Sequence, residues 1–244
     1  MLKSYLQGSV FGREYGVGNP AALALHGWRR SHEDWAPLLN GLPALALDLP
    51  GFGASPPPPG AWGSAEYAEF LSPLLDAFPD IQILVGHSFG GRIAVQLAAR
   101  RPERFRHVIL AGVPLVRVVP HPTPALSFRL MRRANQWGLI SDNRMEALRR
   151  SRGSDDYKAL EGTMRAVLVR TVNESYEELL ERIDCEVDLV WGERDQVVPV
   201  GVCERAETLI RHCHVTVCSG EGHLGPVLRP TELRRIVTRS LEVK

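Results

Sequence analysis

The chain lacks the features that mark a membrane-spanning, secreted or nucleic-acid-binding protein. No run of about 18 apolar residues occurs, and residues 1–8 lack the apolar core of a secretory signal. The 29 basic and 28 acidic residues leave a formal net charge of +1, so no overall attraction to nucleic acid or to an anionic membrane is expected. We therefore expect a soluble cytoplasmic protein that neither binds nucleic acid nor inserts into a membrane.

Cysteine and lysine are also scarce. The four cysteines form neither a Cys-x-x-Cys pair nor a disulfide framework, so we expect reduced packing residues. His212 and His214, just before an expected strand, would share one face if the strand began earlier, but no second ligand pair accompanies them, and no metal site is predicted. Lysine occurs only at positions 3, 158 and 244, which leaves few candidates for a lysine base.

Short apolar runs rich in β-forming residues are the expected strands of one sheet. Several show little alternation of polar and apolar residues, which is typical of parallel strands buried on both faces. Helix-like segments separate them, so we predict an α/β fold with a mainly parallel sheet and helices on both faces. The expected strands are residues 21–25, 44–47, 81–85, 108–111, 187–191 and 215–218, with one or two antiparallel edge strands within residues 3–16. The expected helices are residues 33–39, 64–77, 90–101, 202–211 and 231–243.

The connection between the expected strands at residues 108–111 and 187–191 is far longer than a single crossover helix requires. Its sequence is amphipathic with helical spacing. We predict that residues 1–112 and 187–244 form the core, and that residues 113–186 form a helical cap. The cap is expected over the carboxyl edge of the sheet, where open α/β sheets bind ligands. Most apolar cap residues are expected to pack on the sheet, and the candidates left to line a substrate pocket are Phe128, Met131 and Trp137.

Residues 86–90 read Gly-His-Ser-Phe-Gly and lie between an expected strand and an expected helix. Glycines two residues either side of Ser88 allow the chain to turn tightly, so the hydroxyl is expected to project from the top of the sheet. The backbone N–H of Phe89, at the helix start, is expected to face whatever that hydroxyl attacks. The alternative is a glycine-rich turn in which Ser88 only caps the helix.

A serine hydroxyl becomes a nucleophile when a histidine, itself held by a carboxylate, takes its proton. His223 lies between the last expected strand and the last expected helix, which places it at the sheet edge where Ser88 emerges. His26 is an alternative base, but its position at a strand end favours a role in holding its own loop. We therefore predict His223 as the base.

The expected carboxylate is Asp195, in the loop after the expected strand at residues 187–191. Glu193 is an alternative that we expect at the rim or paired with Arg194. Asp48 is expected to fix the Pro-Gly turn that follows it. For a second oxyanion donor we predict the backbone N–H of Trp28, whose indole would also line the acyl pocket.

These segments together resemble the α/β-hydrolase family. They are His-Gly-Trp at 26–28, Asp-Leu-Pro-Gly-Phe-Gly at 48–53, Gly-His-Ser-Phe-Gly-Gly at 86–91, residues 192–195 and Gly-His at 222–223. They occur in the family's order of nucleophile, acid and histidine. The resemblance implies an eight-stranded, mostly parallel sheet with a helical cap. It also implies Ser88 as nucleophile, His223 as base, Asp195 as orienting acid, and the Trp28 and Phe89 N–H groups as the oxyanion hole.

The resemblance implies hydrolysis of small to medium acyl or aryl esters through an acyl-enzyme, without metal or organic cofactor. Haloalkane dehalogenases and epoxide hydrolases of this fold carry aspartate where this chain has Ser88, so those reactions are not expected. One alternative is an esterase or thioesterase for anionic or carrier-bound acyl groups, steered by cap arginines. Carbon–carbon bond hydrolysis of a diketone and a ligand-binding receptor are the others. Arg92, directly after the serine turn, is less typical of small carboxylesterases. The resemblance therefore does not fix which acid portion of a substrate the site binds.

Overall fold

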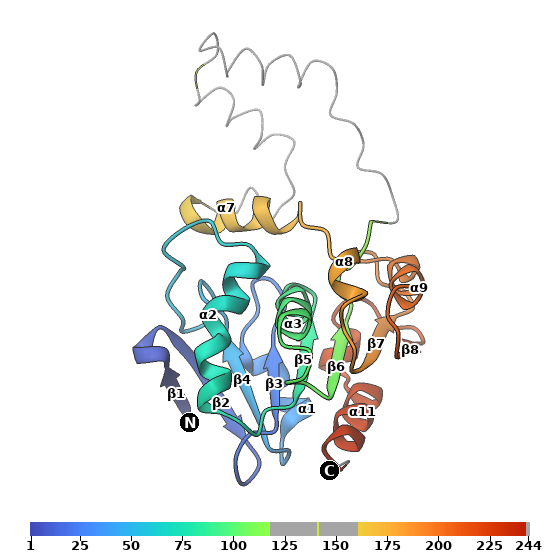
Figure 1. The fold of residues 1–244 in the computed structure, drawn as a ribbon, viewed down its shortest axis with the longest axis horizontal. Helices are drawn as coiled ribbons and strands as arrows, with labels where there is room; N and C mark the ends of the chain where they lie inside the picture. Colours follow the sequence, from blue (N-terminus) through green and yellow to red (C-terminus); the bar gives the residue numbers. More distant parts are fainter. Residues whose placement is uncertain (118–140, 142–160, 243–244) are drawn as a thin grey trace.

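The computed structural model describes residues 1–117, 141 and 161–242 and contains one eight-stranded sheet (Figure 1). The strand order is β1-β2-β4-β3-β5-β6-β7-β8. All neighbouring pairs from β4 to β8 are parallel, whereas β1 and β2 add an antiparallel edge. The strands are β1 Leu2–Tyr5, β2 Val10–Tyr15, β3 Ala22–Leu25, β4 Ala44–Asp48, β5 Ile83–His87, β6 His107–Ala111, β7 Glu186–Gly192 and β8 Cys213–Cys218. The predicted α/β fold and its antiparallel edge are confirmed.

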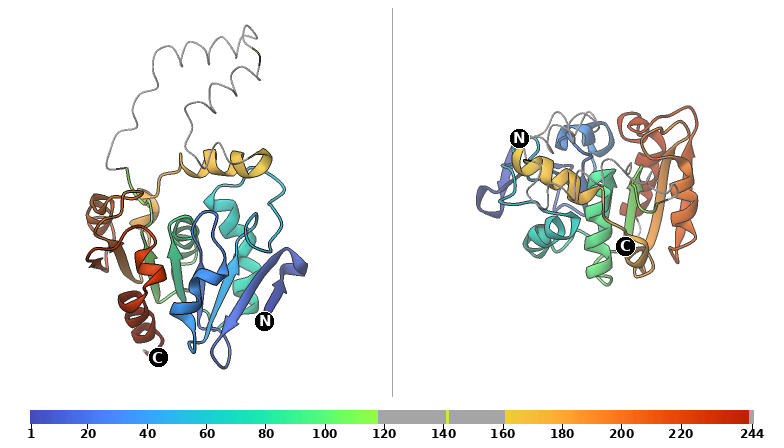
Figure 2. Two further views of the ribbon diagram at one scale, coloured as in Figure 1. Left: turned by 180° about the vertical axis from the view of Figure 1, so that it is seen from behind. Right: turned by 90° about the horizontal axis from the view of Figure 1, so that it is seen from above.

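Side-chain size alternates along the central strands and divides the core into two layers. The leucines of β3 and β4 pack with α2, α3 and α8, while the alanines of the same strands face α1, α11 and the buried ring of Trp35. Figure 2 shows these helices on opposite sides of the sheet. Because successive strand residues point to opposite faces, the alternation of leucine and alanine suits a thick layer on one face and a close-packed layer on the other.

The helices of the described ranges include the five that the sequence predicts, each within a few residues of its expected position. Two more lie in the segment expected to form the helical cap, and one, at residues 225–228, was not predicted. The helices are α1 Ala36–Leu39, α2 Ser64–Ala77, α3 Phe89–Arg100, α7 Gly162–Thr171, α8 Glu177–Leu180, α9 Val200–Glu207, α10 Gly225–Leu228 and α11 Thr231–Glu242, with 3-10 turns at η1 Leu6–Gly8 and η2 His32–Trp35. None of the helices in these described ranges combines the length and apolarity needed to cross a membrane.

Helix α7 crosses above the carboxyl ends of the central strands (Figure 1). Arg92 of α3 donates to the Thr171 carbonyl at the end of α7, and Arg170 donates to the Ala61 carbonyl at 2.8 Å. The proposed cap boundary at residues 113–186 stays a prediction, because residues 118–140 and 142–160 lie outside the described residues. The expected pocket residues Phe128, Met131 and Trp137 and most of the cap arginines also lie outside them.

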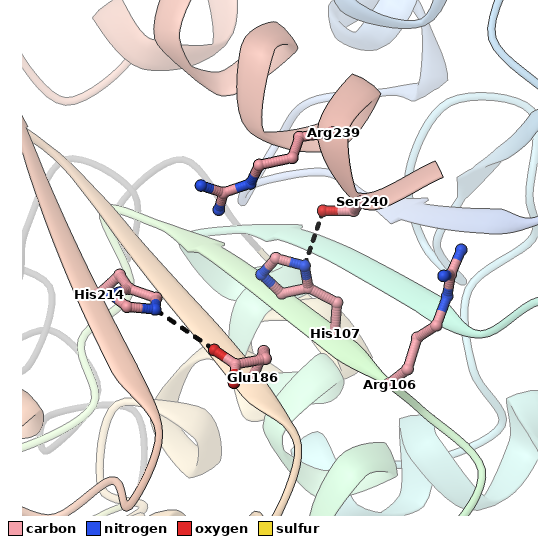
Figure 3. Close-up of a pocket in the computed structure, with 6 residues that line it drawn as sticks. All are labelled: Arg106, His107, Glu186, His214, Arg239 and Ser240. Atoms are coloured by element: carbon pink, nitrogen blue, oxygen red, sulfur yellow. Dashed lines mark hydrogen bonds and ion pairs between the residues drawn. The ribbon is translucent and has the colours of Figure 1, made fainter. Parts of the chain in front are cut away.

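At the amino end of the sheet, a buried polar chain ties α11 to β6 and β7. Ser240 lies 2.7 Å from His107 Nδ1, and His107 Nε2 lies 2.8 Å from the carboxylate of Asp188. Arg239 donates to that carboxylate at 3.0 Å. Ser240 and His107 line a cavity of about 360 Å³ together with Arg106, Glu186, His214 and Arg239 (Figure 3). This series of polar contacts anchors α11 at the end of the sheet opposite its carboxyl edge.

Replacing Ser240 with alanine is expected to lower the free energy of unfolding by about 1 kcal/mol, because His107 loses a buried partner. Chemical denaturation measures this change. Thr238→Ala on the same helix is the matched control and is expected to change stability by less than about 0.5 kcal/mol. Equal stabilities of the two variants would show that the polar chain does not hold α11.

Candidate active site

The predicted tight turn at Ser88 joins β5 to α3. Ser88 has φ 47° and ψ −109°, a backbone conformation that side chains rarely adopt. A Cβ on Gly86 would lie 2.5 Å from the Cα of Gly91, and a Cβ on Gly90 would overlap the carbonyl oxygens of Leu25 and His26. Only glycine fits either position, so the sequence builds a turn that presents the half-buried Ser88 above the sheet.

Asp195 and His223 form a hydrogen-bonded pair. Asp195 follows β7, His223 follows β8, and His223 Nδ1 lies 2.7 Å from Asp195 Oδ2. The other carboxylate oxygen accepts the backbone N–H groups of Val197 and Val198, each at 2.8 Å. Burial opposes ionisation of Asp195, but the hydrogen bonds from His223 and this backbone outweigh it and lower the pKa of Asp195. Since Asp195 takes Nδ1, Nε2 is the ring nitrogen left for a second partner.

The pair lies beside the turn that carries Ser88. His223 Nδ1 is 3.2 Å from the point that a Cβ on Gly112 would occupy, and the preceding carbonyl, of Ala111, accepts the Ser88 N–H at 3.0 Å. The ring centroid of His223 is 4.8 Å from that of His87, the residue before Ser88. Within the described residues, no hydrogen bond joins the Ser88 hydroxyl to His223; catalytic hydrogen bonds commonly tighten only when substrate binds.

Two backbone donors adjoin the turn. Phe89 is the first residue of α3, and the next N–H, of Gly90, donates to the His26 carbonyl at 3.0 Å, which ties the turn to the Gly27–Trp28 loop. In the part of the chain that the structure describes, neither the Phe89 N–H nor the Trp28 N–H donates to another protein group. The positive end of α3 favours negative charge beside the Phe89 N–H.

Aromatic rings form an apolar wall next to these donors. The ring of Phe89 lies 5.1 Å from that of Trp28 and 5.2 Å from that of Tyr67, and Trp28 lies 4.9 Å from Phe52, all edge-on. Met164 of α7 packs onto the loop at Gly51, where a Cβ would overlap its thioether. Edge-on contacts between aromatic rings are favourable and hold them in fixed orientations.

His26 holds its own loop, as its position at a strand end predicts. Its Nε2 accepts the Leu49 N–H at 3.0 Å, so the proton lies on Nδ1, which donates to the Gly27 carbonyl at 2.7 Å. Complete burial lowers the pKa of His26 to about 4. Both ring nitrogens are occupied, and the ring has no lone pair left to act as a base.

The alternative carboxylates also have other partners. Glu193 lies at the exposed rim and accepts from the Gly220 N–H at 2.7 Å and from Ser219 at 3.0 Å. Asp48 accepts the Ala54 N–H at 2.9 Å across the Pro-Gly turn that it was expected to fix. Arg92, whose role the sequence left open, donates to the Thr171 carbonyl and packs 5.6 Å from the ring centroid of Tyr176. It therefore fixes the segment after α7.

Residues 22–236 match the family model described as "Alpha/beta hydrolase family". The chain belongs to the α/β hydrolase family. It is similar to the biotin biosynthesis bifunctional protein BioHC of Cellvibrio japonicus, with 26% identity over 88% of this chain and 46% of that protein. Esterase Rv0045c of Mycobacterium tuberculosis is 34% identical over 43% of this chain and 37% of that protein. The chain thus spans less than half the length of each of these two proteins.

The fold is similar to that of the esterase RhEst1 from Rhodococcus sp. ECU1013, with a TM-score of 0.68, 23% identity, and coverage of 100% of this chain and 98% of that one. A hydrolase from Pseudomonas aeruginosa PA01 gives a TM-score of 0.72, with 19% identity and coverage of 100% and 98%. These two likenesses show the fold. No group of three or more histidine, cysteine or acidic residues suited to a metal ion occurs among the residues that the structure describes.

The buried neutral state of His26 predicts acid lability. A histidine with an ordinary pKa near 6.5 when unfolded and about 4 when folded stabilises the fold above pH 6.5 and loses this contribution as the pH falls towards 4. We expect about 3 kcal/mol of unfolding free energy to depend on this group.

Denaturant unfolding between pH 7 and pH 4 measures this dependence. His26→Asn is expected to be less stable at pH 7 but to lose less stability on acidification. The exposed His212→Asn is the control and should follow the wild type. A His26→Asn curve parallel to that of the wild type would contradict the assignment.

Proposed function

We propose that the protein is a serine hydrolase that cleaves carboxylic esters of small to medium acyl or aryl groups through an acyl-enzyme. The observation that carries this proposal is the Asp195–His223 hydrogen bond of 2.7 Å beside the strained turn at Ser88. A carboxylate fixes the tautomer and orientation of an imidazole there, and a hydroxyl projects from the adjacent strand end. This combination activates a serine without a metal ion.

The reaction begins when His223 Nε2 takes the proton of Ser88 as its oxygen attacks the ester carbonyl. The carbonyl oxygen gains negative charge and accepts the N–H groups of Trp28 and Phe89, each worth about 3 kcal/mol of barrier. The Asp195 carboxylate offsets the charge of the imidazolium. The intermediate collapses as His223 returns the proton to the leaving alcohol. A water molecule that loses its proton to His223 then attacks the acyl-enzyme. The bond between the acyl carbon and the Ser88 oxygen breaks, His223 gives its proton to that oxygen, and the acid leaves.

The aromatic wall favours an apolar acyl or aryl group. The rings of Trp28, Phe52 and Phe89 contact one another close to Ser88 in sequence or through the turn. Phe52 and Phe89 are buried and support the partly buried Trp28, the ring that we expect to face the acyl group. Arg92, the cation nearest the turn in sequence, is bonded to the Thr171 carbonyl, so it is not placed to bind a substrate carboxylate. A panel of p-nitrophenyl esters from acetate to laurate, run beside a thioester and a diketone, separates this proposal from thioesterase and carbon–carbon hydrolase activity.

Ser88→Ala is expected to abolish ester turnover and labelling by a fluorophosphonate, because no other group supplies the attacking oxygen. Intact-mass analysis and p-nitrophenyl ester assays measure both. Ser240→Ala is a matched control, since Ser240 also contacts a histidine that contacts an aspartate. That variant should keep its label and activity. A label that persists in Ser88→Ala would refute the nucleophile.

Asp195→Asn is expected to lower kcat by about 10,000-fold, because an amide no longer holds the productive tautomer of His223. Glu193→Gln is the matched control at the rim of the same loop and is expected to lower kcat by less than about threefold. Steady-state kinetics of both variants on one ester decide the question. Near-normal turnover in Asp195→Asn with a collapse in Glu193→Gln would assign the acid to Glu193.

A further inference from the structure

His87 links the serine turn to the loop of the base. It is the last residue of β5, directly precedes Ser88, and is 2% exposed. Its Nε2 lies 3.0 Å from the backbone carbonyl oxygen of His223, across 136 positions of sequence. The two rings are tilted by 50° with centroids 4.8 Å apart. One side chain therefore contacts the backbone and the ring of the proposed base.

The hydrogen-bond partner of Nε2 determines which ring nitrogen of His87 carries the proton. A carbonyl oxygen only accepts hydrogen bonds, so Nε2 must carry the hydrogen. Nδ1 is buried and has no hydrogen-bond partner among the described residues. It lies 2.6 Å from the point that a Cβ on Gly27 would occupy, so the tight contact with this loop leaves no room for a polar partner on that side. A second proton on Nδ1 would be a buried donor without an acceptor, which is costly.

Burial favours the same neutral form of His87 and outweighs the carboxylates of Asp34 and Asp195, which raise its pKa. His223 and Asp195 face it from the loops after β8 and β7, and Asp34 faces it from η2, where it is itself paired with Arg30 at 2.5 Å. Burial, with a smaller contribution from His223, lowers the pKa of His87 to about 4. The ring is uncharged throughout the pH range in which an esterase histidine works.

We propose that His87 is a positioning residue whose Nε2–H, bonded to the His223 carbonyl, sets the base at the distance from Ser88 that proton transfer needs. The proposal rests on the proposed function of Ser88 and His223. Other backbone bonds hold the ends of this loop, from Arg194 N–H to the Glu221 carbonyl at 2.8 Å and from Gly225 N–H to the Gly222 carbonyl at 3.0 Å. Among the described residues, His87 alone donates to the carbonyl of His223 itself.

The variants for the test separate the donor from the bulk of the side chain. His87→Gln keeps an N–H near the position of Nε2, whereas His87→Met keeps the volume and loses the donor. We expect His87→Met to lower kcat, and the rate of fluorophosphonate labelling, by about 10- to 100-fold with KM changed less than about threefold, because small displacements of reacting groups are costly. His87→Gln is expected to recover most of the loss. The exposed His212→Met serves as the control and should match the wild type.

A ¹⁵N NMR spectrum of histidine-labelled wild-type protein tests the proton directly and needs no variant to fold. We expect His87 to stay in the Nε2-protonated neutral form down to about pH 5, one unit above its pKa of about 4. A proton on Nδ1, or a ring that becomes charged near neutral pH, would overturn the proposal.

The kinetic outcomes distinguish this proposal from the proposed function. A wild type that is labelled at Ser88, with His87→Met equally active, would overturn only the positioning role. Equal losses in His87→Gln and His87→Met would also overturn it, because the donor would then not matter. A wild type that neither hydrolyses esters nor takes the label would overturn the proposed function, and the positioning role with it.

Discussion

At the carboxyl edge of this sheet, the loops pack so closely that several positions have no room for a side chain. The arrangement of the residues at this edge depends on that close packing. A Cβ on Gly90 would overlap the carbonyls of the β3 end, one on Gly112 would lie 3.2 Å from the ring of His223, and one on Gly192 would lie 2.6 Å from the Glu221 carbonyl oxygen. Glycine at these positions lets the loops after several strands approach one another closely. Asp195 and His223, far apart in the chain, pair beside the turn that carries Ser88 because these loops can touch.

The electrostatic arrangement follows from the same packing. His26 and His87 are buried as neutral rings with pKa values of about 4. Asp195 is a buried carboxylate whose pKa is lowered by its hydrogen bonds, although burial opposes them. The buried charge of Asp195 is therefore directed at His223, while the neighbouring imidazoles contribute hydrogen bonds without charge. Such preorganisation costs little at the moment of reaction.

The sequence predicted the fold where local rules suffice. Helix α2 has its predicted bounds because the Glu66 carboxylate accepts the Gly63 N–H at its start and Pro79 follows its end. The turn at Ser88 was predictable from glycine spacing, and the parallel order of the strands placed Asp195 and His223 at one edge. These rules need only neighbouring residues and the direction of the strands.

The sequence could not predict contacts that depend on tertiary packing. Nothing near His87 indicates that its Nε2 meets the carbonyl of residue 223, and nothing near Arg92 indicates the carbonyl of Thr171. The first contact joins the residue before Ser88 to the backbone of His223. The second gives Arg92, whose role the sequence left open, a structural contact with the end of α7. His87 directly precedes Ser88 and Arg92 lies shortly after it, yet the partners of both side chains lie on distant segments of the chain.

The most direct measurement is a crystal structure of the protein after reaction with a fluorophosphonate that mimics the tetrahedral intermediate. The account predicts phosphorus bonded to the oxygen of Ser88, with one phosphoryl oxygen accepting the backbone N–H groups of Trp28 and Phe89. It also predicts His223 facing the adduct while bonded to Asp195. An adduct on another residue, or a phosphoryl oxygen directed away from both N–H groups, would contradict it.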